Sequence, residues 1–132
     1  MRVVILGCGR VGARLAGMLE TAGHQVSLID KSIEAFARLA PNFAGLVVLG
    51  NGIDEDILEQ AGIGTADALC ALTNSDNTNI MASQVAREVF HVTRVITRIY
   101  DPERQDTFRA AGLETVCPTR VGVAQIEALI GA

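Results

Sequence analysis

The stretch Val3-Val4-Ile5-Leu6-Gly7-Cys8-Gly9-Arg10-Val11-Gly12 decides the fold of this chain. Its first four residues are an apolar run typical of a strand that is buried on both faces. A segment with helical spacing follows and ends at Gly23, and its predicted apolar face carries Val11, Leu15, Met18, Leu19 and Ala22. A strand, a glycine loop and a helix in this order are typical of a site that holds the phosphates of a nucleotide.

Each glycine of the loop has a physical role in such a site. Gly7 allows the tight turn out of the strand, Gly9 lets the backbone approach a pyrophosphate, and Gly12 lets the helix pack closely on the sheet. The helix N-terminus then offers unpaired N–H groups and a partial positive charge to the phosphates. We therefore expect the whole loop, with Cys8 and Val11 included, to contribute to nucleotide binding.

An acidic residue completes this pattern. Asp30 ends a second apolar run, Val26–Ile29, at the distance from the loop that is typical of a ribose-binding acid. A carboxylate there accepts hydrogen bonds from both ribose hydroxyls of an adenosine and repels a 2′-phosphate, so NADP is disfavoured. Lys31 follows directly and weakens that exclusion slightly. The alternative is that Asp30 caps the next helix.

Arg10 is an unusual member of the loop, because a cation at a helix N-terminus is mildly unfavourable. A cation there reaches a terminal phosphate or the ligand of a neighbouring subunit. The alternative is an exposed first-turn arginine without a ligand, and the sequence favours the phosphate role.

The remaining sequence alternates apolar runs with helical segments. Further strands are predicted at residues 46–49, 67–72, 94–99 and 114–117. Helices are predicted over 33–40, from Asp54 to Gly62, along a face made by Ala82, Val85, Ala86 and Val89, from Asp101 to Gly112, and from Pro118 onward. This order predicts one α/β domain over residues 1–132, with a Rossmann-like, doubly wound six-stranded parallel sheet and helices on both faces.

Ligands of such sheets bind beyond the carboxyl ends of the strands, near the point where the strand order reverses. The residues predicted there, besides the loop and Asp30-Lys31, are Asn51, Gly52, Ile53, Thr73, Asn74 and Arg98. Thr73 and Asn74 offer polar groups to the second half of a dinucleotide or to a terminal phosphate, and ordinary loop chemistry is the alternative. Arg98 is expected to point toward the crevice or a subunit boundary.

The composition excludes several classes of function. The net charge of −4 argues against nucleic acid as a partner. No apolar stretch approaches the roughly 20 residues that a membrane span needs. Because the first strand starts at the N-terminus, we expect no signal peptide. Cys8, Cys70 and Cys117 show no metal-ligand spacing and are interpreted as reduced cytosolic thiols, and the two histidines as structural.

The sequence indicates a binding site without a reaction centre. Lys31 is the only lysine and Tyr100 the only tyrosine, so a Tyr-x-x-x-Lys pair is impossible. The residue pattern supplies neither a substrate domain nor a proton-transfer group at the expected crevice. We therefore predict that the domain is not an enzyme.

The order of motifs resembles the N-terminal (TrkA-N) domain of RCK or KTN proteins, the regulators of potassium channels and transporters. The segments that carry the resemblance are 4–12, 23–26, 28–31, 50–52, 58–63, 66–68, 76–79, 97–99, 101–102, 112–113 and 116–118. One departure is Thr119, since family members often carry an acid after the proline that begins this helix. A cation-binding role at that position is therefore not expected.

The resemblance implies a cytoplasmic regulatory domain, peripheral to the inner face of the plasma membrane through its membrane-embedded potassium channel or transporter. Such domains bind NAD(H) or adenine nucleotides such as ATP, ADP and AMP. They assemble as homodimers and larger rings, and ligand exchange rearranges the assembly. In this family the arginine of the glycine loop, here Arg10, is associated with contacts to terminal phosphates. Family members usually continue into a second, C-terminal ligand domain.

The last predicted helix supports assembly independently. It carries two apolar stripes, Val123-Ile126-Ile130 and Val121-Ala124-Ala128. We expect one stripe to meet the chain's own sheet and the other a partner, although exposed alanine and valine are also common. Two alternatives to the regulatory function are an NAD-dependent oxidoreductase with its substrate domain elsewhere, and a redox-sensing repressor, which the acidic charge disfavours.

Overall fold

The computed structural model describes all of residues 1–132 and contains one six-stranded sheet. Its strands are β1 (Arg2–Leu6), β2 (Gln25–Asp30), β3 (Leu46–Leu49), β4 (Ala68–Ala71), β5 (Arg94–Arg98) and β6 (Glu114–Val116). They lie in the order β3-β2-β1-β4-β5-β6, and every neighbouring pair is parallel. The sheet grows outward from β1 in one direction and from β4 in the other, which confirms the predicted Rossmann-like fold.

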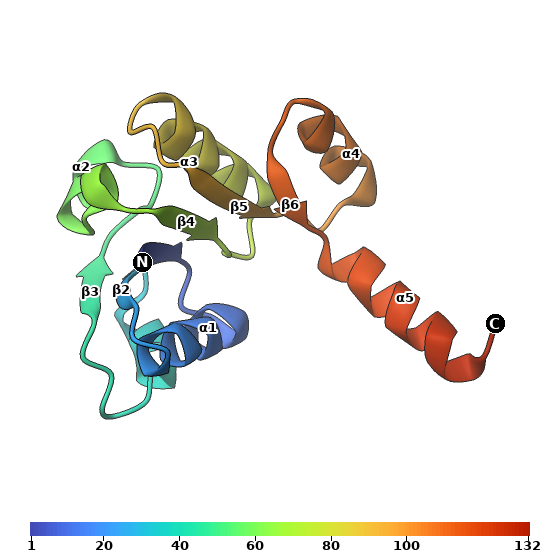
Figure 1. The fold of residues 1–132 in the computed structure, drawn as a ribbon, viewed down its shortest axis with the longest axis horizontal. Coiled ribbons are helices and arrows are strands. Elements are labelled where there is room, and N and C mark those ends of the chain that lie inside the picture. The colour runs from blue at the N-terminus through green and yellow to red at the C-terminus, as the bar shows by residue number, and fades with distance from the viewer.

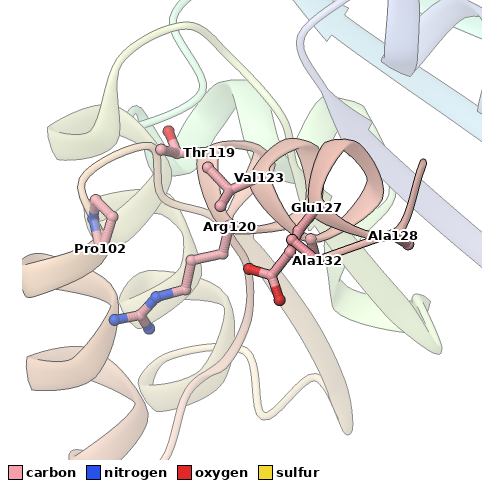
Figure 2. Close-up of a pocket in the computed structure, with 8 residues that line it drawn as sticks. Pro102, Thr119, Arg120, Val123, Glu127, Ala128 and Ala132 are labelled. Carbon is pink, nitrogen blue, oxygen red and sulfur yellow. The ribbon is translucent and has the colours of Figure 1, made fainter. Parts of the chain in front are cut away.

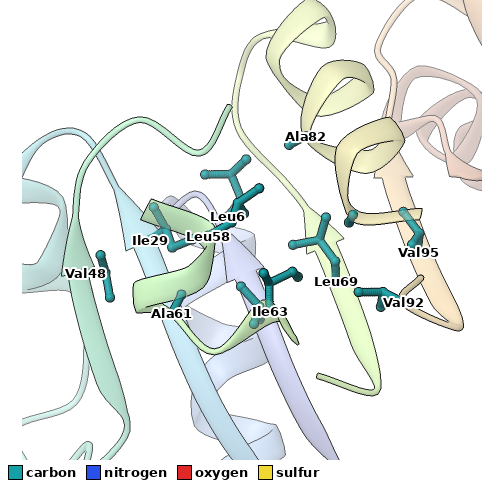
Figure 3. Packing of buried hydrophobic residues seen from close by; sticks show 12 residues of the cluster. Leu6, Ile29, Val48, Leu58, Ala61, Ile63, Leu69, Ala82, Val92 and Val95 are labelled. Atoms are coloured by element: carbon teal, nitrogen blue, oxygen red, sulfur yellow. The ribbon is translucent and has the colours of Figure 1, made fainter. Parts of the chain in front are cut away.

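Both faces of the sheet are covered, because successive residues of a strand point to opposite sides. Val3 and Ile5 of β1 belong to a core cluster with α1 (Arg10–Thr21) and η1 (Ile33–Arg38). Val4 and Leu6 belong to the cluster on the other face, which Figure 3 shows. The helices on that face are α2 (Glu55–Gln60), η2 (Ile63–Thr65) and α3 (Asp76–Glu88).

The remaining helices are α4 (Pro102–Ala110), which packs beside β6, and α5 (Pro118–Ile130). Asp101 caps α4 by accepting the N–H of Glu103 at 3.0 Å, and Pro102 occupies its first turn, as the sequence predicts. None of the helices is both long enough and apolar enough to span a bilayer.

The predicted apolar face of α1 is partly wrong. Val11 and Met18 point to solvent, and Met18 is 71% exposed. The buried residues of the helix are the small ones, Gly12, Ala13 and Ala16. A Cβ atom on Gly12 would lie 1.9 Å from the carbonyl oxygen of Gly7. The helix therefore approaches the sheet closely at its small residues, and Leu15 and Leu19 of the predicted face pack partly buried against the same core.

The helix predicted over residues 33–40 is a 3₁₀-helix that ends at Arg38. Its N-cap residue, Ser32, makes no capping bond, because its hydroxyl donates to the Glu34 carboxylate at 2.9 Å instead. A segment this short without a side-chain cap favours the tighter 3₁₀ form. The ends of the other elements differ from the prediction by one or two residues, which is ordinary fraying.

The expectation that one stripe of α5 packs on the chain's own sheet is wrong. No residue of α5 is buried, and Leu129 and Ile130 are 87% and 73% exposed. The helix projects away from the sheet as the red element in Figure 1. Both apolar stripes are therefore uncovered in the single chain.

Only the first turn of α5 is fastened to the domain. The Thr119 hydroxyl donates to the Tyr100 carbonyl at 2.9 Å. Arg120 reaches away from the helix (Figure 2) and donates to both carboxylate oxygens of Asp106, at 2.7 and 3.0 Å, and to the Gln105 side chain at 2.7 Å. The hydrogen bond from Arg120 lowers the pKa of the Asp106 carboxyl.

Candidate functional site

A crevice of about 410 Å³ lies at the carboxyl ends of the central strands, where the strand order reverses between β1 and β4. The sequence-predicted residues that line it are Gly7, Cys8, Gly9, Asp30, Lys31, Asn51, Gly52, Thr73, Asn74 and Arg98. The loops after β1, β2, β3 and β4 and the last residue of β5 thus meet at one place. The remaining predicted residues, Arg10, Val11, Gly12 and Ile53, do not line this crevice.

The glycine loop combines close packing below with open space above. Gly7 has a φ of +104°, and a Cβ atom on it would lie 2.9 Å from backbone atoms of Leu72 and Thr73. Gly9 has no atom within 4 Å of a Cβ position. No side chain caps the N-terminus of α1, and its first turn carries no acid. The loop therefore leaves room, and unneutralised N–H groups, for an anion above Gly9.

Asp30 fastens this loop to the end of β2. One carboxylate oxygen accepts the N–H of Cys8 at 2.8 Å, and the other accepts the N–H of Ser32 at 2.9 Å. The capping position of η1 itself is occupied by Ser32. Each oxygen of an ionised carboxylate has a second acceptor direction, so both remain able to accept a hydroxyl.

Cys8 fills space under the loop. Its side chain is fully buried, and its thiol donates to the Ala35 carbonyl at 3.3 Å. Burial, reinforced by the nearby charge of Asp30, raises the pKa of the Cys8 thiol. The thiol is therefore protonated at neutral pH and is a weak nucleophile.

The opposite wall of the crevice is built around Thr73, at the end of β4. Its N–H and hydroxyl donate to the Asn79 side-chain oxygen at 2.9 and 2.7 Å. Its carbonyl accepts from the Asn79 amide at 3.0 Å and from Arg98 at 2.9 Å. The polar groups of Thr73 are thus engaged within the protein, whereas Asn74 is exposed and carries no side-chain bond.

Arg98 braces this wall. Its guanidinium donates to the carbonyls of Leu72 and Thr73 and stacks 5.0 Å from the ring centre of Tyr100. Its Nε is the one buried side-chain nitrogen or oxygen atom without a hydrogen-bond partner. Of the two orientations that the sequence left open, the structure places Arg98 along the crevice.

The loop after β3 closes the third side. The Asn51 side chain accepts the N–H of Ile53 at 3.2 Å, which turns the chain toward α2 and leaves Ile53 outside the crevice. Gly52 is buried, and a Cβ atom there would lie 2.2 Å from the Leu6 side chain. Gly52 therefore sets how closely this loop approaches β1.

Several lining residues were missed by the sequence reasoning: Leu6, Ser32, Ala35, Arg38, Gly50, Leu72 and Thr78. Arg38 is the chemically important one, and it donates to the Cys8 carbonyl at 3.4 Å. It comes from the far end of η1, so no motif spacing points to it. With Lys31 and Arg98 it sets three cations against the single carboxylate of Asp30, and this balance favours an anionic ligand.

The structure has no grouping of three or more His, Cys, Asp or Glu side chains that could hold a metal ion. The crevice instead combines a glycine loop, an acid at the end of β2 and a set of cations. This donor set fits a phosphorylated nucleoside, with phosphates at the loop and a ribose at Asp30.

Comparison with known proteins agrees with this geometry. The family model described as the TrkA-N domain matches residues 3–119. The Trk system potassium uptake protein TrkA of Streptomyces coelicolor is 48% identical over 120 residues, which are 91% of this chain and 54% of that protein. A TrkA homolog of Methanothermobacter thermautotrophicus is 36% identical over 98% of this chain and 60% of its own length. The chain thus spans between half and two thirds of these relatives.

Solved structures with the same fold include parts of the GsuK channel. A structure described as the GsuK channel bound to NAD is 29% identical, with a TM-score of 0.80 over 97% of this chain and 23% of that one. GsuK bound to ADP matches with a TM-score of 0.81 and 29% identity over 98% and 34% of the two chains. The TrkA-N domain of the inner membrane protein ybaL from Escherichia coli, 21% identical, shares the fold with a TM-score of 0.85 over 97% and 95%.

Proposed function

The chain belongs to the TrkA-N domain family, and we propose that it is a regulatory domain of a potassium-transport system that binds NAD(H) or an adenine nucleotide. The observation that carries this proposal is the crevice at the reversal of the strand order. There the open space above Gly9 and the carboxylate of Asp30 lie on one side of a preformed wall.

In this proposal the adenosine lies at the β2 side of the crevice. Asp30 accepts the ribose hydroxyls while it keeps its bonds to Cys8 and Ser32, and its charge disfavours a 2′-phosphate. The phosphates lie above Gly9, at the N-terminus of α1. Asn51, Asn74 and Lys31 offer further polar groups at the rim.

Four of the predicted binding residues lie outside the crevice: Arg10, Val11, Gly12 and Ile53. Gly12 acts indirectly, by letting α1 approach the loop. Arg10 is exposed at the start of α1, outside the crevice. It suits a terminal phosphate that extends out of the crevice, or the ligand of a neighbouring subunit, better than the adenosine itself.

Regulation then follows from differential affinity. Two nucleotides, or two redox forms of one, that bind unequally to two arrangements of an oligomer shift the balance between them. We propose that the oligomer is a homodimer or a larger ring. Its partner is a membrane-embedded potassium channel or transporter, at whose cytoplasmic face the domain acts. The sequence similarity to Trk system potassium uptake proteins and the likeness to the GsuK channel support this assignment.

Calorimetric titration with NAD⁺, NADH, ATP, ADP, AMP and NADP⁺ tests the proposal. We expect at least one adenine nucleotide to bind, and NADP⁺ to bind more weakly than NAD⁺. Asp30→Ala should weaken binding by roughly ten- to a hundredfold, because it removes hydrogen bonds to a charged acceptor. Asp67→Ala is the matched control, since Asp67 also accepts a backbone N–H, from Arg2 at 2.8 Å, at the other end of the sheet.

Gly9→Val tests the position of the phosphates. No atom lies within 4 Å of a Cβ position on Gly9, and its backbone is extended, so we expect the free protein to accept a valine that blocks the ligand's approach. Binding that survives both Asp30→Ala and Gly9→Val would place the nucleotide elsewhere. Steady consumption of NADH by the chain would favour the oxidoreductase alternative, whereas binding without turnover supports a sensor.

A further inference from the structure

A buried asparagine lies behind the crevice without lining it. Asn79 lies in α3 with 0% of its side chain exposed. Its side chain makes four hydrogen bonds. Its oxygen accepts the N–H and hydroxyl of Thr73, and its nitrogen donates to the carbonyls of Thr73 at 3.0 Å and Arg98 at 2.9 Å. These are the contacts that a buried primary amide needs to be satisfied.

Asn79 does not line the crevice, but both of its partners do. Thr73 lies in the loop after β4, two residues past the strand, and Arg98 is the last residue of β5. One side chain therefore joins two neighbouring strand ends from behind. The guanidinium of Arg98 returns to the carbonyls of Leu72 and Thr73, which closes the network.

This network also touches the glycine loop. A Cβ atom on Gly7 would lie only 2.9 Å from the backbone of Leu72 and Thr73. A shift of the wall toward β1 would push on Gly7, and a shift away would open a gap beneath the loop. The wall and the phosphate loop are therefore in contact, but the loop also keeps its own bonds to β2, from the Gly7 N–H to the Ile29 carbonyl at 2.7 Å and from the Cys8 N–H to Asp30 at 2.8 Å.

We propose that Asn79 is a positioning residue of the nucleotide crevice, which holds the ends of β4 and β5 as one fixed wall for the part of the ligand beyond the adenosine. This inference rests on the proposed nucleotide function. Asn79 acts through Thr73 and Arg98 and does not touch the ligand. The wall is preorganised, so binding does not have to order it.

Without Asn79, a smaller fraction of the molecules has the wall in the position that binds the ligand. Without the amide, the Thr73 N–H and carbonyl lose partners in a part-buried place, and the loop moves to satisfy them with water. An apparent dissociation constant rises in inverse proportion to the competent fraction. A wall that is correct in one molecule of ten therefore weakens binding about tenfold.

Asn79→Ala is compared with Ser83→Ala as a matched control. Ser83 is also fully buried, lies one turn further along α3, and bonds β5 through the Thr97 hydroxyl at 2.7 Å. Thr97 does not line the crevice. Both variants thus delete a buried polar group between α3 and β5, but only the first one reaches the wall.

Calorimetric titration of AMP and NAD⁺ into the wild type and both variants gives the decisive readout, with urea unfolding to confirm that each variant is folded. AMP ends at the phosphate loop, whereas NAD⁺ continues to the β4 and β5 wall. We expect Asn79→Ala to weaken NAD⁺ binding about tenfold, which corresponds to a correctly placed wall in one molecule of ten. The same variant should weaken AMP binding clearly less. Ser83→Ala should change the binding of neither ligand. An equal loss for both ligands, or the same loss in Ser83→Ala, would overturn the inference.

Failure of the proposed function has a different signature, because the wild type would then bind neither ligand, and the inference would fall with it. If Asn79→Ala does not fold, hydrogen exchange of the wild type decides. The Thr73 amide should be protected before nucleotide is added and gain little on adding NAD⁺. A Thr73 amide that exchanges freely in the free protein and becomes protected only with NAD⁺ would show that the ligand, not Asn79, orders the wall.

Discussion

At the scale of single residues, two glycines and an asparagine shape the crevice alongside the charged side chains. Gly7 and Gly12 allow the loop, α1 and the end of β4 to come within contact distance of one another. Asn79 fixes the wall that this contact creates. Asp30 and Arg98 hold the same frame through bonds to the backbone, and the charged residues also supply the ligand chemistry.

Substitution of Gly7 tests this frame directly. Gly7→Ala places a Cβ atom 2.9 Å from the backbone of Leu72 and Thr73 at a φ of +104°. We expect it to lower the free energy of unfolding by about 2–3 kcal/mol. Gly17→Ala is the control, because nothing lies near its Cβ position within α1. It should raise stability by up to about 1 kcal/mol through helix propensity. Urea unfolding measures both, and equal effects would contradict the argument.

Cys70 on β4 makes the free energy of unfolding depend on pH in the alkaline range. Burial raises the pKa of its thiol from 9.0 to about 11. Between these values the unfolded thiol ionises while the folded one keeps its proton, so the folded state loses stability as pH rises. The loss attributable to Cys70 should reach about 2 kcal/mol by pH 11. Unfolding measured at pH 8 and pH 11 should show a steeper decline in the wild type than in Cys70→Ala, and parallel declines would contradict the assignment.

At the scale of elements, the sequence predicts what local patterns control. The strand positions follow from apolar runs such as Val3–Leu6, and the helix ends follow from Asp101-Pro102 and the glycines. The predicted face of α1 is right for Leu15 and Leu19, which pack against the core, and wrong for Val11 and Met18. The residues that the close approach to the sheet buries are the small ones, and apolar periodicity does not point to them. Periodicity also could not show that α5 leaves the sheet, since an apolar stripe does not identify its neighbour.

The residues of the crevice also divide into those that local sequence patterns predict and those that depend on packing. Residues next to a strand end, such as Asp30 and Asn74, are predicted by topology alone. Arg38 and Asn79 were not predicted as site residues, because their places depend on how η1 crosses Cys8 and how α3 packs behind Thr73. Contacts of that kind carry no spacing signal along the chain.

The anchoring of α5 gives a prediction at this scale. Arg120 and Thr119 are the residues of its first turn that bond the rest of the domain through their side chains. Arg120→Ala should increase the amide exchange of residues 121–130 and leave the exchange of β1 and β4 unchanged, since those strands lie in the core. Arg109→Ala serves as the control, because this exposed arginine of α4 makes no ion pair. Unchanged exchange of α5 in Arg120→Ala would mean that the helix is held by other contacts.

At the scale of the whole molecule, α5 is a helix whose apolar side chains are not packed against the rest of the chain. A helix of 13 residues that buries nothing is marginally stable in water. Val121, Val123, Ile126, Leu129 and Ile130 are all exposed and give α5 an apolar surface along most of its length. Surfaces of this kind, larger than scattered single residues, mark places where proteins associate. A second copy of the chain, which brings the same surface, supplies a self-complementary partner.

Sedimentation of the wild type and two matched variants tests this association. We expect the wild type to form dimers or larger assemblies, and the double variant Ile126→Asp, Leu129→Asp to be monomeric, because two charges would have to be buried without partners. Met18→Asp is the control, since it places a charge at an equally exposed apolar residue on α1. It should leave assembly unchanged.

The monomeric variant should still bind nucleotide if the site is complete within one chain, because α5 does not line the crevice. If only the assembled protein binds, a neighbouring subunit completes the site, and Arg10 at its exposed position is the first residue to test across that boundary. A wild type that stays monomeric at high concentration would show that α5 is covered by something other than a second copy.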